Sequence, residues 1–144
     1  MRHIVHLLAV VMLVTGLTGC SYVFYPRAGE YIEQAKGASG VETLLNLTTM
    51  MEASAKAAKG GTGYDQPLND LHNQFHAFDK SLCCLDKTTR ELPAYALAVT
   101  HNKELMAIFK RLWKFKDDQP QRDQHLDLFA TEVRELRETL QTLK

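Results

Sequence analysis

The sequence is poor in the features that mark several large classes of protein. It has three cysteines in 144 residues, too few for a fold built on a framework of disulfides. Its 17 basic side chains are matched by 17 acidic ones, so no overall charge favours nucleic acid as a partner. The longest apolar run, Ile4 to Val14, includes a histidine and is shorter than the roughly 20 residues that a transmembrane helix needs.

The sequence also lacks the local motifs of common catalytic and cofactor sites. It contains no HExxH or paired CxxC motif for zinc, no CxxCH motif for covalent haem, and no glycine-rich loop after a strand pattern. No serine has the context of a nucleophile elbow, and the acidic pair Asp117-Asp118 falls in a turn, where it suits a helix cap. We therefore expect that the protein is not an enzyme.

What the sequence does have is a start with the three parts of a secretory signal peptide. Arg2 and His3 give a positive beginning, Ile4 to Val14 form an apolar core, and small residues follow. The stretch Leu17-Thr18-Gly19-Cys20 then resembles the lipobox of bacterial lipoprotein precursors. This resemblance covers only the signal region, and an ordinary secretory signal with a chance cysteine is the alternative.

The resemblance implies a lipid anchor at Cys20. Its sulfur would receive a diacylglycerol, residues 1–19 would be cleaved, and the new N-terminus would be acylated. Two or three acyl chains hold a protein firmly on a bilayer, whereas one does not. Ser21 after the cysteine resembles an outer-membrane address, which places the protein on the periplasmic face. Residues 20–27 would be a short tether whose aromatic side chains suit the membrane interface.

Residues 28–144 read as a single helical domain. Apolar residues recur at steps of three and four, and no segment alternates with the period of two that a strand requires. Helices are expected over 28–36, 41–58, 68–85, 94–115 and 126–143. The apolar stripe expected over 94–115 runs through Ala94, Leu97, Ala98, His101, Leu105, Ile108, Leu112 and Phe115. Short polar connections favour antiparallel neighbours. The sequence therefore predicts an all-α, up-down antiparallel bundle of about four main helices.

Several local signals support these boundaries. Ser39 and Glu42 have the spacing of a capping box, Gly60-Gly61 suits a helix end, and Pro67 is tolerated in a first helical turn. Among the charged side chains, basic ones are in excess over residues 103–116 and acidic ones over residues 117–138. This opposite charge modestly favours side-by-side packing of the last two helices.

The 68–85 helix carries a possible metal site. Positions i, i+4, i+7 and i+11 lie in one stripe of a helix, and imidazole, carboxylate and thiolate groups bind zinc or copper. The residues at these positions are His72, His76, Asp79 and Cys83. The alternative is an ordinary solvated flank. The adjacent pair Cys83-Cys84 is read as two thiols near a helix end, as a vicinal or intermolecular disulfide, or as a reactive site.

His101 falls inside an apolar stripe. It is read as a histidine at the edge of the core with one ring nitrogen bonded to a neighbour. A haem or metal ligand is the alternative, with Met50, Met51 or Met106 as a second ligand, although methionine at helical spacing usually fills a core.

The stretch from 109 to 116 mixes basic and aromatic residues, which suits contact with an acidic partner or anionic lipid. The residues are Phe109, Lys110, Arg111, Trp113, Lys114 and Lys116. The alternative is the outer face of a helix that turns Phe109, Leu112 and Phe115 inward.

The function that best fits these observations is that of a non-catalytic, lipid-anchored accessory protein that binds another protein of the cell envelope. Its size and outline are similar to pilotins and other accessory lipoproteins, without any motif that matches them residue by residue. No cofactor and no nucleic acid is expected. The alternative is a periplasmic bundle lipoprotein that binds a metal or haem.

Overall fold

The computed structural model describes residues 27–143, so residues 1–26, which include Cys20 and the predicted signal peptide, lie outside the described part of the chain. The described part has six helices and no strands. Two helices are short, namely α3 (Ala28–Gln34) and α6 (Lys87–Arg90). The four long helices are α4 (Gly40–Ala57), α5 (Asp65–Cys83), α7 (Pro93–Lys114) and α8 (Gln119–Gln141).

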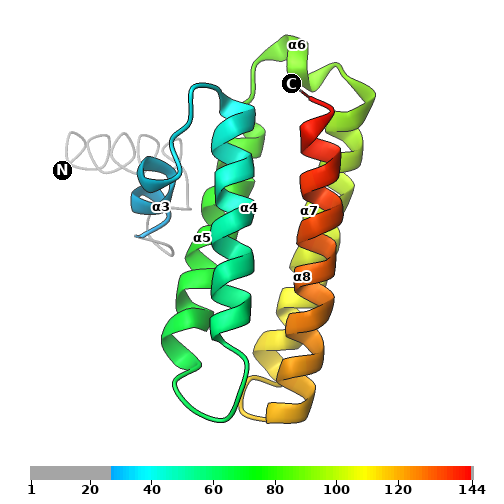
Figure 1. The fold of residues 1–144 in the computed structure, drawn as a ribbon. Coiled ribbons are helices and arrows are strands. Elements are labelled where there is room, and N and C mark those ends of the chain that lie inside the picture. The colour runs from blue at the N-terminus through cyan, green and yellow to red at the C-terminus, as the bar shows by residue number, and fades with distance from the viewer. Residues whose placement is uncertain (1–26, 144) are drawn as a thin grey trace, which may run out of the picture.

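The four long helices form an up-down antiparallel bundle, which confirms the predicted fold (Figure 1). The α4–α5 and α7–α8 connections lie together at one end of the bundle, and α6 lies at the other end beside the C-terminus. α4 packs against α5 and α8, and α7 packs against α8. The backbones of α5 and α7 stay further apart, so side chains must fill that side of the bundle.

Apolar periodicity builds one continuous core, because each long helix turns a single stripe inward. The predicted stripe of α5 and its end is buried throughout, at Leu68, Leu71, Phe75, Phe78, Leu82 and Leu85. The predicted stripe of α8 and its end is also buried throughout, at Leu126, Phe129, Val133, Leu136, Leu140 and Leu143.

Helix α7 is rotated slightly from its predicted phase. Leu97 is 50% exposed, so its predicted place in the apolar stripe is wrong. The buried face instead runs through Ala98, Asn102, Leu105, Phe109 and Leu112. Because Asn102 is polar, the sequence did not indicate that this face of α7 is buried. Asn102 is accommodated there because its side-chain amide donates a hydrogen bond to Asp79 Oδ1 at 2.7 Å.

Side-chain caps mark the starts of three helices, α4, α6 and α8. Ser39 Oγ accepts from the Glu42 backbone N–H at 3.1 Å, as the predicted capping box requires, while the Glu42 carboxylate accepts from the Ala38 N–H at 2.7 Å. The predicted break over residues 86–93 contains a helical turn, α6. It forms because the Asp86 side chain accepts from the backbone N–H of Thr89 at 2.9 Å and so satisfies a free donor.

Helix α3 is fastened to α5 through Asp70. Its carboxylate accepts from Tyr31 Oη at 2.6 Å, from Arg27 Nη1 at 3.0 Å and from Gln66 Nε2 at 2.8 Å. Burial, then the hydrogen bond to Asp70, raises the pKa of Tyr31 to about 12. The point at which the described chain begins is therefore held beside the N-terminal half of α5.

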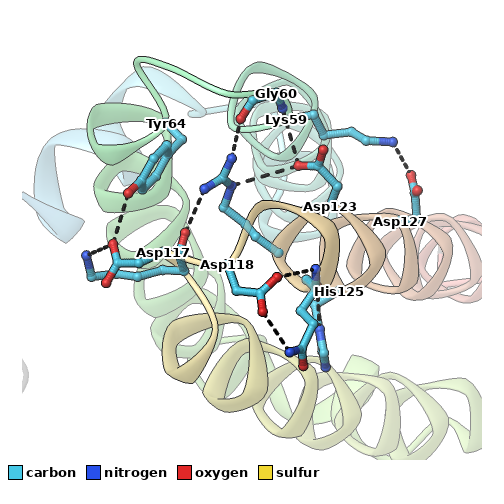
Figure 2. Close-up of polar contacts among 11 residues, drawn as sticks. Lys59, Gly60, Tyr64, Asp117, Asp118, Asp123, His125 and Asp127 are labelled. Carbon is cyan, nitrogen blue, oxygen red and sulfur yellow. Dashed lines mark hydrogen bonds and ion pairs between the residues drawn. The ribbon is translucent and has the colours of Figure 1, made fainter.

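Arg122 ties the two loops at one end of the bundle together, and we call this arrangement the Arg122 clasp. Arg122 is 1% exposed, and its guanidinium donates to the backbone carbonyls of Lys116, at 2.7 Å, and Gly60. Its guanidinium carbon lies 3.8 Å from the centre of the Tyr64 ring. Figure 2 shows this end, where Tyr64 also donates to Asp117 Oδ1 at 2.9 Å. The clasp thereby fixes the C-terminal end of α7.

Candidate functional site

Aromatic side chains hold α5 and α7 apart. The rings of Phe75 and Phe109 are stacked with centroids 6.3 Å apart. His72 of α5 lies against two rings of α7, with centroid distances of 4.9 Å to Phe109 and 5.3 Å to Trp113. Because these rings are wide, the two helices cannot approach as closely as α7 and α8 do, and the outer side of the interface is left open.

The result is a groove of about 360 Å³ between α5 and α7. We call it the α5–α7 groove, and its lining residues are His72, His76, Met106, Phe109, Lys110 and Trp113. It joins part of the predicted metal stripe to part of the predicted contact surface. Phe109 is only 5% exposed and belongs to the core, whereas Trp113 is 39% exposed. Trp113 is therefore the aromatic residue most available to a partner.

The histidines of the groove are neutral at physiological pH. Burial lowers the pKa of His72. Burial and then the neighbouring His72 lower the pKa of His76 to about 4, against a raising effect of Asp79. Their ring centroids are 5.0 Å apart. Neutral imidazoles leave the groove mainly apolar, with Lys110 supplying a positive charge.

The predicted metal stripe is only partly drawn together. Asp79 is engaged by Asn102, and Cys83 lies at the end of α5 as an exposed free thiol beside the exposed Cys84. Burial, followed by Asp79, raises the pKa of the Cys83 thiol. Within residues 27–143, the stripe does not bring three donor atoms within 4.8 Å of one another. Metal binding by this stripe stays a prediction.

The basic residues of the predicted contact surface continue from the groove to the end of α7. Lys110, Arg111 and Lys114 are exposed, and the Lys114 Nζ lies 5.1 Å from the centre of the Phe115 ring. Lys116 Nζ lies 2.7 Å from Asp117 Oδ1, and this hydrogen bond raises the pKa of Lys116. The surface beside the groove is therefore positive, apart from Asp117 and Asp65, which both pair with Lys116.

A second cluster of titratable groups lies between α7 and α8. His101 Nδ1 is 2.6 Å from Glu132 Oε1, and both side chains are almost buried. This confirms that His101 sits at the core edge with one nitrogen bonded to a neighbour. Glu135 brings a second carboxylate, so that one donor atom from each of the three residues lies within 4.8 Å of the other two. Burial raises the pKa of Glu132, His101 lowers it, and Glu104 raises it.

The methionines that were predicted as possible second ligands beside His101 do not all lie on the side of α7 that His101 faces. Met106 lines the α5–α7 groove, whereas His101 faces α8. Met51 is fully buried in the core stripe of α4, and Met50 packs against the core. The structure therefore directs His101 to carboxylates of α8.

The sequence analysis did not single out Arg122 or Glu132, although the sequence contained a signal for Arg122. Arg122 lies four residues before Leu126 and seven before Phe129, so the apolar phase of α8 already placed it inward. Glu132 carried no such signal, because its importance depends on the rotation of α8 relative to α7.

The fold and its grooves define the described chain as an all-α helical bundle. Comparisons with models of protein families, with curated proteins and with solved structures found no match to this chain. None of the helices in the described range is both long and apolar enough to cross a membrane.

Proposed function

We propose that the protein is a lipid-anchored, non-catalytic accessory protein that binds another protein of the bacterial cell envelope on the periplasmic face of the outer membrane. The address rests on the resemblance of Leu17-Thr18-Gly19-Cys20 to a lipobox. The observation that carries the binding role is the α5–α7 groove, where the chain's single tryptophan is 39% exposed beside a row of basic side chains. Tryptophan and arginine are enriched among residues that dominate protein interfaces.

The chemistry of the groove favours an amphipathic helix with acidic residues as its occupant. Met106, Phe109 and Trp113 form an apolar floor and wall, which would receive the apolar face of such a helix. Lys110, Arg111 and Lys114 are exposed beside it, and opposite charges on a partner would speed association and fix its orientation. The affinity should accordingly fall as salt is added.

The groove would lie close to the anchor. Arg27 Nη1 lies 3.0 Å from Asp70 Oδ1 on α5, and Asp70 precedes His72 by two positions. Arg27 follows Cys20 by seven positions, and an extended chain spans at most roughly 25 Å over seven positions. A lipid on Cys20 would therefore keep the bundle within a short reach of the bilayer, where its partner would also be embedded or attached.

The anchor is tested by intact-mass measurement of the protein purified from its native host. We expect a chain that starts at Cys20 and carries the added mass of a diacylglycerol and an N-acyl chain. A Cys20→Ala variant should leave the membrane fraction. Retention of residues 1–19, or an unmodified thiol at a new N-terminus, would overturn the proposed address.

The partner surface is tested by cross-linking in intact cells. A photoreactive residue at position 114 should capture one envelope protein, and the yield should fall by more than about tenfold in Trp113→Ala and Lys110→Glu, as for central interface residues. Leu128→Ala removes another exposed apolar residue and Lys87→Glu reverses a charge at the far end of the bundle, so both should leave the yield unchanged. Equal yields in all four variants would exclude the groove as the interface.

A further inference from the structure

The His101–Glu132 pair joins α7 to α8 at a point where both side chains are largely buried. His101 Nδ1 and Glu132 Oε1 are 2.6 Å apart, and the two side chains are 13% and 12% exposed. Burial of charged groups is costly unless they are paired or bound to a metal. This pair lies outside the α5–α7 groove, and the proposed partner binding makes no use of it.

A third donor converges on the same place. Glu135 lies one helical turn beyond Glu132, so both carboxylates project from the same side of α8. One donor atom from each of His101, Glu132 and Glu135 lies within 4.8 Å of the other two. Two ligands that are both about 2.0 to 2.2 Å from one metal ion are separated by less than this, so the three groups already have nearly the required spacing.

The charges at this place are unbalanced. Two carboxylates face one imidazole, which carries at most a single positive charge, and Glu104 follows His101 by one turn on α7. A divalent cation would offset both carboxylates at once. Because an imidazole nitrogen is among the donors, the set suits a transition ion better than Mg²⁺ or Ca²⁺, which prefer oxygen ligands only.

We propose that His101, Glu132 and Glu135 bind a divalent transition-metal ion of the Zn²⁺ type, with water completing a tetrahedral site. The ion would link α7 to α8 across their interface. The donor set of one histidine and two carboxylates is distinct from the His72/His76 stripe of α5, and it draws on two helices that the fold packs together.

The test is a titration of the chelator-treated, full-length protein with Co²⁺ and with Zn²⁺. Co²⁺ should give visible absorption bands of a tetrahedral complex, with one equivalent bound, and Zn²⁺ should displace it. Zn²⁺ should also raise the midpoint of thermal unfolding, because a ligand that binds only the folded state stabilises it.

Substitutions locate the ion. Glu135 is exposed, so Glu135→Gln should fold normally while affinity falls by more than about tenfold, since even substitutions around the ligands lower metal affinity roughly 10- to 100-fold. His101→Asn should abolish the absorption bands. The matched controls are Glu138→Gln and His125→Asn, and both should bind as the parent does. Circular dichroism checks that each variant remains helical.

Three outcomes would overturn the proposal. The first is the absence of saturable binding by either ion at concentrations up to about 1 mM, which would be very weak binding. The second is unchanged affinity in both Glu135→Gln and His101→Asn. The third is binding that disappears in His72→Asn instead, which would assign the ion to the predicted stripe on α5. None of these outcomes bears on whether the α5–α7 groove binds a partner.

Discussion

At the scale of single residues, the Arg122 side chain makes several of the contacts that join the loops at one end of the bundle. Its buried guanidinium satisfies two loop carbonyls and covers the ring of Tyr64. Asp123 Oδ1 lies 3.8 Å from Arg122 Nε and also accepts from the Gly60 N–H at 3.2 Å (Figure 2). The loops after α4 and α7 are therefore joined to each other and to the start of α8.

We predict that Arg122→Met lowers the free energy of unfolding by about 2 to 3 kcal/mol. Methionine fills much of the space but leaves the carbonyls of Gly60 and Lys116 without their donor, and an unsatisfied buried group costs about 1 to 3 kcal/mol. Urea denaturation followed by circular dichroism measures the change. Arg111→Met, at an exposed site, should have almost no effect, and equal stability of the two variants would contradict this role of the clasp.

His76 makes stability depend on pH. Its pKa is lowered from 6.5 to about 4, first by burial, so between these values the unfolded chain binds a proton that the folded chain does not. Stability should therefore fall as pH decreases from about 6.5 to 4. Denaturation midpoints across this range should show the slope, and His76→Gln should flatten it. An NMR titration midpoint near 6.5 for His76 would refute this explanation.

At the scale of helices, side-chain caps mark the starts of α4, α6 and α8. Ser39 has extended backbone angles and accepts the Glu42 N–H, which satisfies a donor that has no partner within the helix. Asp86 and Asp118 do the same at α6 and α8. By contrast, the start of α7 has no side-chain cap and uses Pro93, whose missing N–H needs no acceptor there.

We predict that Ser39→Ala destabilises the protein by about 1 kcal/mol, the usual effect of losing an N-cap. Ser54→Ala in the last turn of α4 is the control within the same helix, and it should be neutral or slightly stabilising because alanine has the higher helix propensity. Chemical denaturation of the two variants gives both values. If the two substitutions have equal effects, the cap does not stabilise α4.

At the scale of the whole molecule, the buried residues form a single cluster that runs from α3 to the end of α8. Helices that share one core are expected to unfold together. The open side between α5 and α7 does not divide this core, because Phe75, Phe109 and Phe129 connect across it: Phe109 stacks on Phe75 and meets Phe129 edge-on at 6.4 Å.

We predict a single cooperative unfolding transition. Trp113 is the only tryptophan, so its fluorescence reports on the α5–α7 groove, whereas circular dichroism at 222 nm reports on all helices. The two signals should change at the same urea concentration. An earlier fluorescence change would show that the end of α7 opens separately, contrary to the fixing of that end by the Arg122 clasp.

The sequence predicted the class of fold, the four long helices and most of their buried stripes. These features depend on spacing within one helix, as in Leu68, Leu71 and Phe75, and spacing is visible in a sequence. The buried face of α7 was predicted less well. Asn102 is buried although it is polar, and Leu97 is exposed although its apolar side chain suggested a place in the core. The groove was found only as two separate candidates, one at His72 and His76 and the other around Trp113.

By itself, then, the sequence determined which segments form the four long helices and which stripe most of them bury, because both follow from contacts among residues three and four apart. The tertiary structure alone decided which polar groups meet. Glu132 reaches His101 from 31 residues away, and Arg122 reaches Gly60 from 62 residues away. Such contacts depend on how the helices rotate and pack against one another, and this arrangement cannot be predicted from the spacing of residues within one helix.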